Sequence, residues 1–303
     1  MQEINQPFWL ASNESESESE SESNSPVLHF VHGNSFPTGT YSVFLKQLQP
    51  YYQIRALDMH GHNPAFPVTD CWPELCKELI ASIEAGKNTR DAMRNTARPV
   101  ILLGHSLGGM LSLMVAKMRP DLVRCVVMLD SPVVAGWRAK FLRVAKIFAL
   151  ENYFGPAKFS KKRRKSWANA EEAYQHFFAK AAFAIWPEQV LRDYIQYGTE
   201  PYPKGVTLHF KRDIETAIYR TLPHIIDRFT ALPFPVPIGF ICGTTSEECR
   251  QAGIYHTQQL VADNFEWISG GHLYPLESPE IAAQKAHTMI QKLLASSPSF
   301  PQP

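Results

Sequence analysis

Short runs of apolar residues alternate along the chain with segments whose apolar positions recur at helical spacing. The middle runs do not alternate between apolar and polar positions, which is typical of strands buried on both faces of a parallel sheet. We therefore predict strands at Val27–Val31, Ile54–Leu57, Val100–Leu103, Val123–Leu129, Ile238–Cys242 and Phe265–Ile268.

Helices are predicted between these strands at Tyr41–Leu48, Pro73–Glu84 and Leu107–Met118. A last helix is predicted to start at Ser278-Pro279, because serine suits the N-cap position and proline suits the first turn. Its apolar positions keep helical spacing at Ala282, Ala286, Met289, Ile290 and Leu293. Strands that alternate with helices predict an α/β fold, in which helices flank a mostly parallel central sheet.

The alternation stops between residues 135 and 233, a stretch that is rich in aromatic residues in largely helical settings. These aromatics are Trp137, Phe141, Phe148, Tyr153, Phe154, Trp167, Phe177, Phe178, Phe183 and Trp186. Asn169 followed by Glu172 resembles a capping box at a helix start, and the proline-dense segment Leu232–Pro237 leads into the next strand. We predict that residues 135–233 form a helical cap, or lid, inserted into one core made of residues 26–134 and 234–296.

The two ends of the chain differ from the rest. A short edge strand is predicted at Phe8-Trp9-Leu10, and residues 12–25 then alternate five glutamates with serines and asparagines. Because the Ser-Glu tract has no apolar residue to bury, it cannot offset the entropy of becoming ordered. We predict that residues 1–25 hold an edge strand and a disordered tract, and that residues 297–303 form a disordered tail.

Composition narrows the class of protein. The 303 residues include 30 basic and 29 acidic side chains, a net charge of +1, which gives no global attraction to nucleic acid or to an anionic membrane. No apolar run approaches the roughly 18 residues of a membrane-spanning helix, and the first residues lack the pattern of a secretory signal. The five cysteines show no CxxC spacing, so we expect reduced thiols in a soluble cytoplasmic protein, without a disulfide framework or a zinc site.

The stretch Gly104-His105-Ser106-Leu107-Gly108 is the most informative motif, because this G-x-S-x-G pattern follows a predicted buried strand and opens a predicted helix. That context is typical of a nucleophile elbow, and it predicts that Ser106 projects from the carboxyl edge of the sheet. Small residues are needed at 104 and 108 because the turn is strained and neighbouring chain passes close by. A glycine-rich turn without chemistry is the structural alternative.

A serine hydroxyl needs a base to remove its proton. His272 stands in Ser-Gly-Gly-His just after the last predicted strand, so its loop lies at the same edge as Ser106. The order, serine first and histidine last, fits the α/β-hydrolase arrangement. A surface loop histidine is the alternative interpretation.

Four segments together resemble the α/β-hydrolase fold superfamily over about residues 26 to 295: FVHGN at 30–34, DMHGH at 58–62, GHSLGG at 104–109 and GGHLYPLESPE at 270–280. The resemblance implies that Ser106 is the nucleophile and His272 the general base. It also implies that the backbone N–H groups of Leu107 and Asn34 form the oxyanion hole. His32, His60 and His62 are expected to hold loop structure.

The third member of the triad is left open by the sequence. The commonest family pattern places an aspartate after the penultimate strand, where this chain has Thr245 and Ser246, with Glu247 and Glu248 following. Another arrangement of the fold places the acid at Asp130, after the strand that follows the nucleophile helix. We favour Asp130 over Glu247, because Glu247 also suits the first turn of a helix. The remaining alternative is that neither carboxylate orients His272, and that a water or a backbone carbonyl does so.

These features predict a serine hydrolase of the carboxylesterase type, in which an acyl-enzyme forms on Ser106 and water then releases the acid. The alternatives are a C–C bond hydrolase or lyase with the same triad, and a non-catalytic small-molecule binding protein. The lid aromatics suggest an apolar pocket for a small ester, and no cofactor, metal or nucleic acid is implied. The basic cluster Lys161–Lys165 is expected to be a solvated lid segment, with a nuclear localisation signal or an anionic-surface patch as the alternative.

Overall fold

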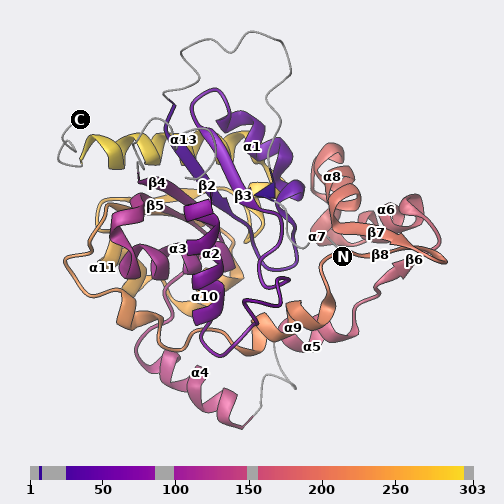
Figure 1. Ribbon diagram of the computed structural model, residues 1–303, viewed down its shortest axis with the longest axis horizontal. Coiled ribbons are helices and arrows are strands. Elements are labelled where there is room, and N and C mark those ends of the chain that lie inside the picture. The colour runs from indigo at the N-terminus through magenta and orange to yellow at the C-terminus, as the bar shows by residue number, and fades with distance from the viewer. Residues whose placement is uncertain (1–6, 9–24, 86–98, 149–155, 297–303) are drawn as a thin grey trace.

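A central sheet of six parallel strands organises the computed structural model, which describes residues 7–8, 25–85, 99–148 and 156–296 (Figure 1). The strands are β2 (Val27–Val31), β3 (Gln53–Leu57), β4 (Val100–His105), β5 (Val123–Leu129), β9 (Ile238–Gly243) and β10 (Phe265–Ile268). Their order is β3-β2-β4-β5-β9-β10, and the short β1 (Pro7–Phe8) pairs antiparallel with β3 at one edge. The predicted α/β fold with a mostly parallel sheet is confirmed.

Successive side chains of the central strands enter two different apolar layers, as the pleat of a strand requires. In β4, Ile101 and Leu103 join one buried cluster and Leu102 joins the other. In β5, Val127 belongs to the first cluster and Val126 to the second. These strands lack an alternation of apolar and polar residues because both faces of the sheet are buried.

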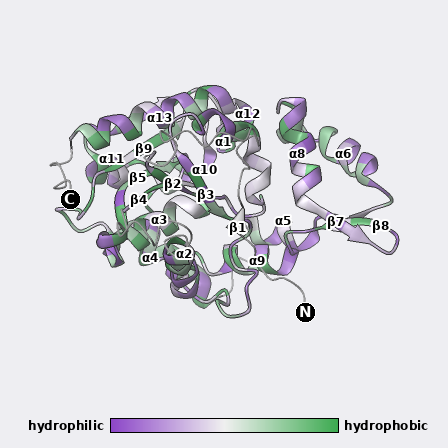
Figure 2. Ribbon diagram, turned by 45° about the horizontal axis from the view of Figure 1, so that its top comes forward, coloured by the Kyte–Doolittle hydropathy of each residue, from purple (hydrophilic) through white to green (hydrophobic). Residues whose placement is uncertain are grey.

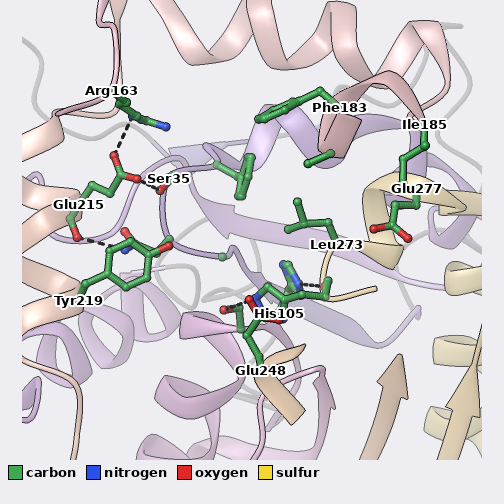
Figure 3. A pocket seen from close by; sticks show the side chains of 16 residues that line it. Ser35, His105, Arg163, Phe183, Ile185, Glu215, Tyr219, Glu248, Leu273 and Glu277 are labelled. Atoms are coloured by element: carbon green, nitrogen blue, oxygen red, sulfur yellow. Dashed lines mark hydrogen bonds and ion pairs between the residues drawn. The ribbon is translucent and has the colours of Figure 1, made fainter. Parts of the chain in front are cut away.

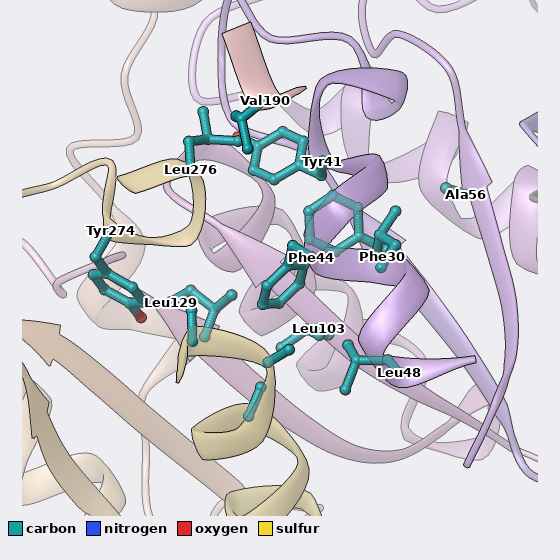
Figure 4. Packing of buried hydrophobic residues seen from close by; sticks show 14 of the residues in the cluster. Phe30, Tyr41, Phe44, Leu48, Ala56, Leu103, Leu129, Val190, Tyr274 and Leu276 are labelled. Atoms are coloured by element: carbon teal, nitrogen blue, oxygen red, sulfur yellow. The ribbon is translucent and has the colours of Figure 1, made fainter. Parts of the chain in front are cut away.

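Helices cover both faces. The first layer packs against α1 (Ser42–Leu48) and α13 (Pro279–Ala295), and Figure 4 shows Phe30, Phe44 and Leu103 packed together there. The second layer packs against helices on the other face. These helices are α2 (Pro73–Ala85), α3 (Leu107–Met118), α10 (Glu247–Ala252) and α11 (Tyr255–Val261). Figure 2 shows the sheet strands as predominantly hydrophobic and the outer helices as mixed.

Most predicted elements keep their boundaries to within one or two residues. One local detail differs at the start of α13. Ser278 does stand at the N-cap position, but its hydroxyl makes no capping hydrogen bond. Ser278 also ends the short α12 (Tyr274–Glu277), where its N–H donates to the carbonyl of Tyr274. The start of α13 therefore relies on Pro279 at the first turn.

The region between β5 and β9 holds the inserted helices. They are α4 (Trp137–Ile147), α5 (Pro156–Lys162), α6 (Ala170–Phe178), α7 (Ala181–Ala184), α8 (Glu188–Gly198) and α9 (Arg212–Arg220). The insert also contains a three-stranded antiparallel sheet, which the helical prediction missed. Its strands are β6 (Ser166–Trp167), β7 (Thr199–Tyr202) and β8 (Gly205–Leu208), in the order β6-β8-β7.

Local signals explain both features of the insert. The side chain of Asn169 accepts a hydrogen bond from the N–H of Glu172 at 2.8 Å, so the predicted cap of α6 is present. Strands β7 and β8 form a tight hairpin whose turn reaches Gly205 at φ +128°, a conformation that favours glycine. The missed strands are only two to four residues long, too short to show a period of two.

Several predictions fall outside the described residues, namely Trp9 and Leu10, the Ser-Glu tract up to residue 24, Tyr153 and Phe154, and residues 297–303. All five cysteines are free and buried. Short connecting 3-10 helices lie at Thr38–Tyr41, Pro120–Leu122 and Ile226–Phe229. Among the described helices, none combines the length and apolar character needed to cross a membrane.

Candidate active site

Ser106 lies on the turn between β4 and α3, with φ +53° and ψ −115°. A Cβ atom at Gly104 would lie 2.3 Å from the backbone of Gly108, and one at Gly108 would lie 1.9 Å from the carbonyl oxygen of Val31. Only glycine therefore fits at both positions of this turn. The predicted strand, tight turn and helix are all present, and the turn places Ser106 at the carboxyl edge of the sheet.

His272 lies within hydrogen-bond distance of both Ser106 and Asp130. His272 Nε2 is 2.9 Å from Ser106 Oγ, and His272 Nδ1 is 2.7 Å from Asp130 Oδ2. Because a carboxylate only accepts, Nδ1–H donates to Asp130 and Nε2 is free to accept from the serine hydroxyl. Three side chains that are far apart in the sequence thus form a continuous chain of hydrogen bonds.

Asp130 directly follows β5, in the left-handed conformation at φ +47°, and is fully buried. Its Oδ1 accepts the N–H of Gly243 at 2.8 Å, and its Oδ2 accepts the hydroxyl of Ser246 at 2.5 Å. The thiol of Cys249 lies 3.4 Å from Oδ1. These donors come from the end of β9 and the start of α10, so Asp130 is held by backbone that the sheet fixes.

Glu247, the alternative acid, is not brought to His272. It opens α10 with its side chain half exposed and forms an ion pair with Arg250. Hydrogen bonds from Arg250 and Gln251 lower the pKa of Glu247 to about 2. Glu248 is the second carboxylate near the histidine, with Oε2 at 3.7 Å from His272 Nδ1. The sequence did not single out Glu248 for this position.

The ionised form of Asp130 and the protonated form of His272 stabilise each other. Burial alone would raise the pKa of Asp130, but hydrogen bonds from His272, Ser246 and the Gly243 N–H hold it below its usual value. Burial alone would lower the pKa of His272, but the hydrogen bond to Asp130 and the charge of Glu248 raise it above its usual value. The arrangement therefore stabilises a protonated imidazole beside an ionised carboxylate.

The proposed oxyanion donors lie beside the serine. Leu107 is the first residue of α3, so its N–H has no acceptor within that helix. Asn34 is buried on the turn after β2, lines the pocket together with Ser106, and fixes its side chain by donating to the carbonyl of Glu215 at 3.2 Å. Within the described residues, neither of these two backbone N–H groups donates a hydrogen bond.

His105, for which the sequence predicts no role, links two loops of the site. Its Nε2 lies 2.9 Å from the carbonyl oxygen of His272, and its Nδ1 lies 2.7 Å from the hydroxyl of Tyr41. Since the carbonyl only accepts, Nε2–H donates and Nδ1 accepts from Tyr41, whose oxygen in turn accepts the N–H of Gly33 at 3.2 Å. Burial lowers the pKa of His105 to about 3, so it stays neutral in this role.

A pocket of about 400 Å³ opens over Ser106 (Figure 3). The core and the insert both line it. The core residues are Gly33, Asn34, Ser35, Phe36, His105, Ser106, Glu248, His272, Leu273 and Glu277. The inserted residues are Arg163, Ala182, Phe183, Ile185, Glu215 and Tyr219. The insert therefore bounds the space in front of the serine.

The apolar pocket expected from the lid aromatics is corrected to a mixed one. Of the eight of these aromatics that the structure describes, only Phe183 lines the pocket. Others, such as Trp167 and Phe177, are buried within the insert, while Trp137 is exposed. Composition could not predict this, because an aromatic residue of a small insert is as useful in its own core as in a pocket wall.

The polar wall comes partly from the basic cluster Lys161–Lys165. Lys161, Lys162 and Lys165 are exposed, as expected for a solvated segment. Arg163 instead turns inward, and its Nε lies 2.9 Å from Oε2 of the buried Glu215, whose other oxygen accepts the hydroxyl of Ser35 at 2.6 Å. Figure 3 shows this ion pair at the end of the pocket away from His105.

The other motif histidines hold loops, as expected. His32 Nε2 accepts the N–H of His60 at 2.7 Å, and His60 Nδ1 lies 3.1 Å from the buried Glu78. His62 Nε2 accepts the N–H of Lys211 at 3.0 Å, which ties this loop to the start of α9. Burial lowers the pKa of His62 to about 4, consistent with a neutral acceptor.

Three groups in the described part of the chain bring metal-ligand types within 4.8 Å of one another: Asp70 with Cys71 and His224, Asp130 with Cys242 and Cys249, and Asp130 with Glu248 and His272. In the first group, the ammonium of Lys146 already pairs with Asp70 and lies 3.3 Å from His224 Nδ1. In the other two, Asp130 is engaged by His272 and Ser246. In each group, the atoms that could bind a metal ion are therefore already engaged by ion pairs or hydrogen bonds.

Comparisons with known proteins agree with this architecture. A model of the alpha/beta hydrolase family matches residues 30–285. A putative esterase/lipase from Haemophilus influenzae is 26% identical over 107 residues, which are 35% of this chain and 34% of that protein. A pimeloyl-(acyl-carrier protein) methyl ester esterase from Xanthomonas oryzae is 29% identical over 98 residues, which are 32% of this chain and 34% of that protein. Each match spans about a third of the relative's length.

Among solved structures, a peroxisomal alpha-beta-hydrolase from Saccharomyces cerevisiae has a TM-score of 0.70 at 14% identity, over 100% of this chain and 93% of that one. At such low identity the likeness speaks for the fold alone. The family model, in contrast, covers most of the sequence and includes the segments that carry Asn34, Ser106, Asp130 and His272. The chain belongs to the alpha/beta hydrolase family.

Proposed function

We propose that this protein is a serine hydrolase of carboxylic esters that works through an acyl-enzyme on Ser106. The observation that carries the proposal is the unbroken hydrogen-bond chain from Ser106 Oγ through His272 to the buried Asp130. A serine placed on a strained turn, next to a base whose other nitrogen is held by a carboxylate, has the geometry of an activated nucleophile. Distant relatives that are named as esterases support the same reaction class.

The reaction would proceed in two steps. Ser106 Oγ attacks the ester carbonyl carbon while its proton passes to His272 Nε2, and the N–H groups of Leu107 and Asn34 stabilise the negative oxygen. The imidazolium, stabilised by Asp130, then protonates the departing alkoxide, which leaves an acyl group on Ser106. Water next attacks this acyl group, with His272 taking its proton. The acid is released as the C–O bond to Ser106 breaks and His272 returns the proton to Ser106 Oγ.

The decisive test is labelling with a fluorophosphonate, followed by mass spectrometry of the peptides. We expect one adduct on Ser106, and loss of both the adduct and p-nitrophenyl ester hydrolysis in Ser106→Ala. Ser112→Ala is the matched control, since Ser112 lies on the same helix and its hydroxyl, among the described residues, bonds only to the carbonyl of Gly108 at 2.7 Å. Wild-type hydrolysis by Ser106→Ala would refute the proposal. A labelled Ser106 without hydrolysis of any tested ester would refute the ester part alone.

A further inference from the structure

Helix α4 exposes its apolar face to solvent, whereas an ordinary surface helix turns that face toward the core. Trp137, Phe141, Val144 and Ile147 recur at intervals of four, three and three residues, so they share one face. Their exposed fractions are 67%, 63%, 47% and 68%. The opposite side carries Ala139, which is only 4% exposed. The helix therefore turns a small residue toward the body of the protein and presents its large apolar side chains to solvent.

Charge accompanies this apolar face. Ten of the chain's 30 lysines and arginines lie between residues 137 and 165, where Glu151 is the one acidic residue. Three of the ten, Lys146, Arg163 and Arg164, pair with acidic residues elsewhere in the chain, and the others add to the basic character of the segment. On α4 itself, Lys140 and Arg143 are exposed, and the guanidinium of Arg138 stacks over the ring of Trp137 at 4.6 Å. The net charge of +1 thus conceals a strongly basic segment. A basic helix with exposed aromatic and aliphatic residues is the composition of an interfacial helix.

We propose that α4 docks this protein onto an anionic lipid surface, with its apolar face in the headgroup region and its basic side chains near the lipid phosphates. The helix has 11 residues, about half of the roughly 20 needed to span a bilayer, so it would lie in the plane of the surface. Buried aromatic and aliphatic area and electrostatic attraction would act together, since neither alone gives stable attachment.

A flat partner fits this helix better than one that wraps around it. Lys146, on the attached side, pairs with Asp70 and donates to the carbonyl of Leu222 at 3.0 Å. These contacts keep α4 against the body of the protein, so only its outer face is open. The Ser-Glu tract has charge that complements the basic residues, but it has no apolar residue that could cover Trp137 and Phe141.

The docking face is separate from the proposed active site. No residue of α4 lines the pocket over Ser106, and in Figures 1 and 2 α4 lies apart from α6 and α8. Substitutions on the exposed face are therefore expected to leave hydrolysis of a water-soluble ester unchanged, which makes lipid binding testable on its own.

The test is co-sedimentation of the full chain with vesicles of phosphatidylcholine alone and with vesicles that also contain phosphatidylserine. We expect binding to the mixed vesicles, weakened by added salt. The double variant Trp137→Ser/Phe141→Ser should bind at least about tenfold more weakly, because two aromatic side chains lose their burial. Lys140→Glu/Arg143→Glu should show a loss of about tenfold or more, through repulsion from the lipid phosphates.

Two further variants test whether lipid binding depends on the apolar face of α4 rather than on any exposed apolar residue. Tyr255→Ser/Ile281→Ser changes two residues with exposed fractions of 66% and 56% on other helices, and it should bind like the parent. Trp137→Leu keeps the face apolar, so it should still bind but lose the blue shift of tryptophan emission that vesicles cause in the parent.

Three results would overturn the proposal. One is the absence of binding to the mixed vesicles. Another is parental binding by the Trp137/Phe141 variant, which would mean that the attraction is electrostatic only. The third is a concentration-dependent dimer of the parent, seen by analytical ultracentrifugation and abolished in that variant, which would assign the face to a second copy of the chain.

Discussion

The sheet edge and the inserted region line the same pocket, but they hold their side chains in different ways. At the sheet edge, Ser106 and Asp130 follow buried strands, and their positions are set by backbone hydrogen bonds to neighbouring strands. In the insert, Ile185 directly follows the four-residue helix α7, and Arg163 is held by its pairing with Glu215. We therefore expect the sheet edge to carry the proposed reaction and the insert to influence which molecules fit the pocket.

The largest effect is expected at the edge, from Asp130→Asn. An amide at this position favours the wrong tautomer of His272 and cannot stabilise the imidazolium, and in a comparable triad this change costs about 10⁴ in kcat. Steady-state hydrolysis of a p-nitrophenyl ester measures it. Glu247→Gln is the control, and it should lose less than about tenfold, since a group outside the triad leaves the tautomer of His272 intact. The opposite ranking would assign the role to Glu247.

A smaller loss is expected from Ser246→Ala. The Ser246 hydroxyl donates to Asp130 Oδ2 and accepts the N–H of Cys249 at 3.1 Å, so it both positions the carboxylate and caps α10. Hydrogen bonds to charged groups contribute about 1.5–3 kcal/mol, and kcat should therefore fall by about 10- to 100-fold. Ser246→Thr keeps the hydroxyl and should restore most of the activity. An unchanged kcat in Ser246→Ala would show that the remaining donors, among them the Gly243 N–H, are enough to position Asp130.

The sequence predicted the sheet edge better than the insert, for a physical reason. Buried strands such as Val123–Leu129 and the glycines of the turn at Ser106 are dictated by packing, and packing leaves a direct mark on residue type. The roles of Ser246 and His105 left no such mark, because serine and histidine suit many environments. Their roles come from contacts with residues that are distant in the sequence. Ser246 bonds to Asp130, more than a hundred positions away, and His105 bonds to His272, 167 positions away.

The insert was predicted least well because its side chains can either pack in the insert's own core or face the pocket and solvent. Phe177 and Tyr194 pack against each other with ring centroids 5.0 Å apart and build the insert's own core. Arg163 belongs to a basic cluster that the sequence predicts to be solvated, yet it pairs with the buried Glu215, which lies more than fifty residues later. No local pattern distinguishes an inward arginine from its outward neighbours.

Ile185→Ala tests the insert's share of the pocket. Ile185 lines the pocket but is 62% exposed, so truncating it should leave the fold intact. We expect KM for an ester to rise by no more than about tenfold with kcat nearly unchanged, because lost contact area weakens ground-state and transition-state binding alike. Ile147→Ala, at 68% exposure on α4, is the matched control and should leave KM unchanged. A fall in kcat alone would move Ile185 into the reaction itself.

The smallest expected effect is a shift in pH dependence, from Glu248→Gln. His272 must be unprotonated to take the proton of Ser106, so activity falls as the pH drops through the pKa of His272. Burial lowers that pKa, but the hydrogen bond to Asp130 and the nearby charge of Glu248 raise it above its usual value. Removing the Glu248 charge, 3.7 Å from His272 Nδ1, makes the imidazolium less stable and lowers the pKa. The acid limb of kcat/KM should therefore move to lower pH while the plateau stays near the parental rate.

Glu247→Gln is the control for this shift. Glu247 is one residue away and paired with Arg250, so its substitution should leave the limb in place. If the limb also stays in place in Glu248→Gln, solvent screens this half-exposed carboxylate, and Asp130 alone raises the pKa of His272.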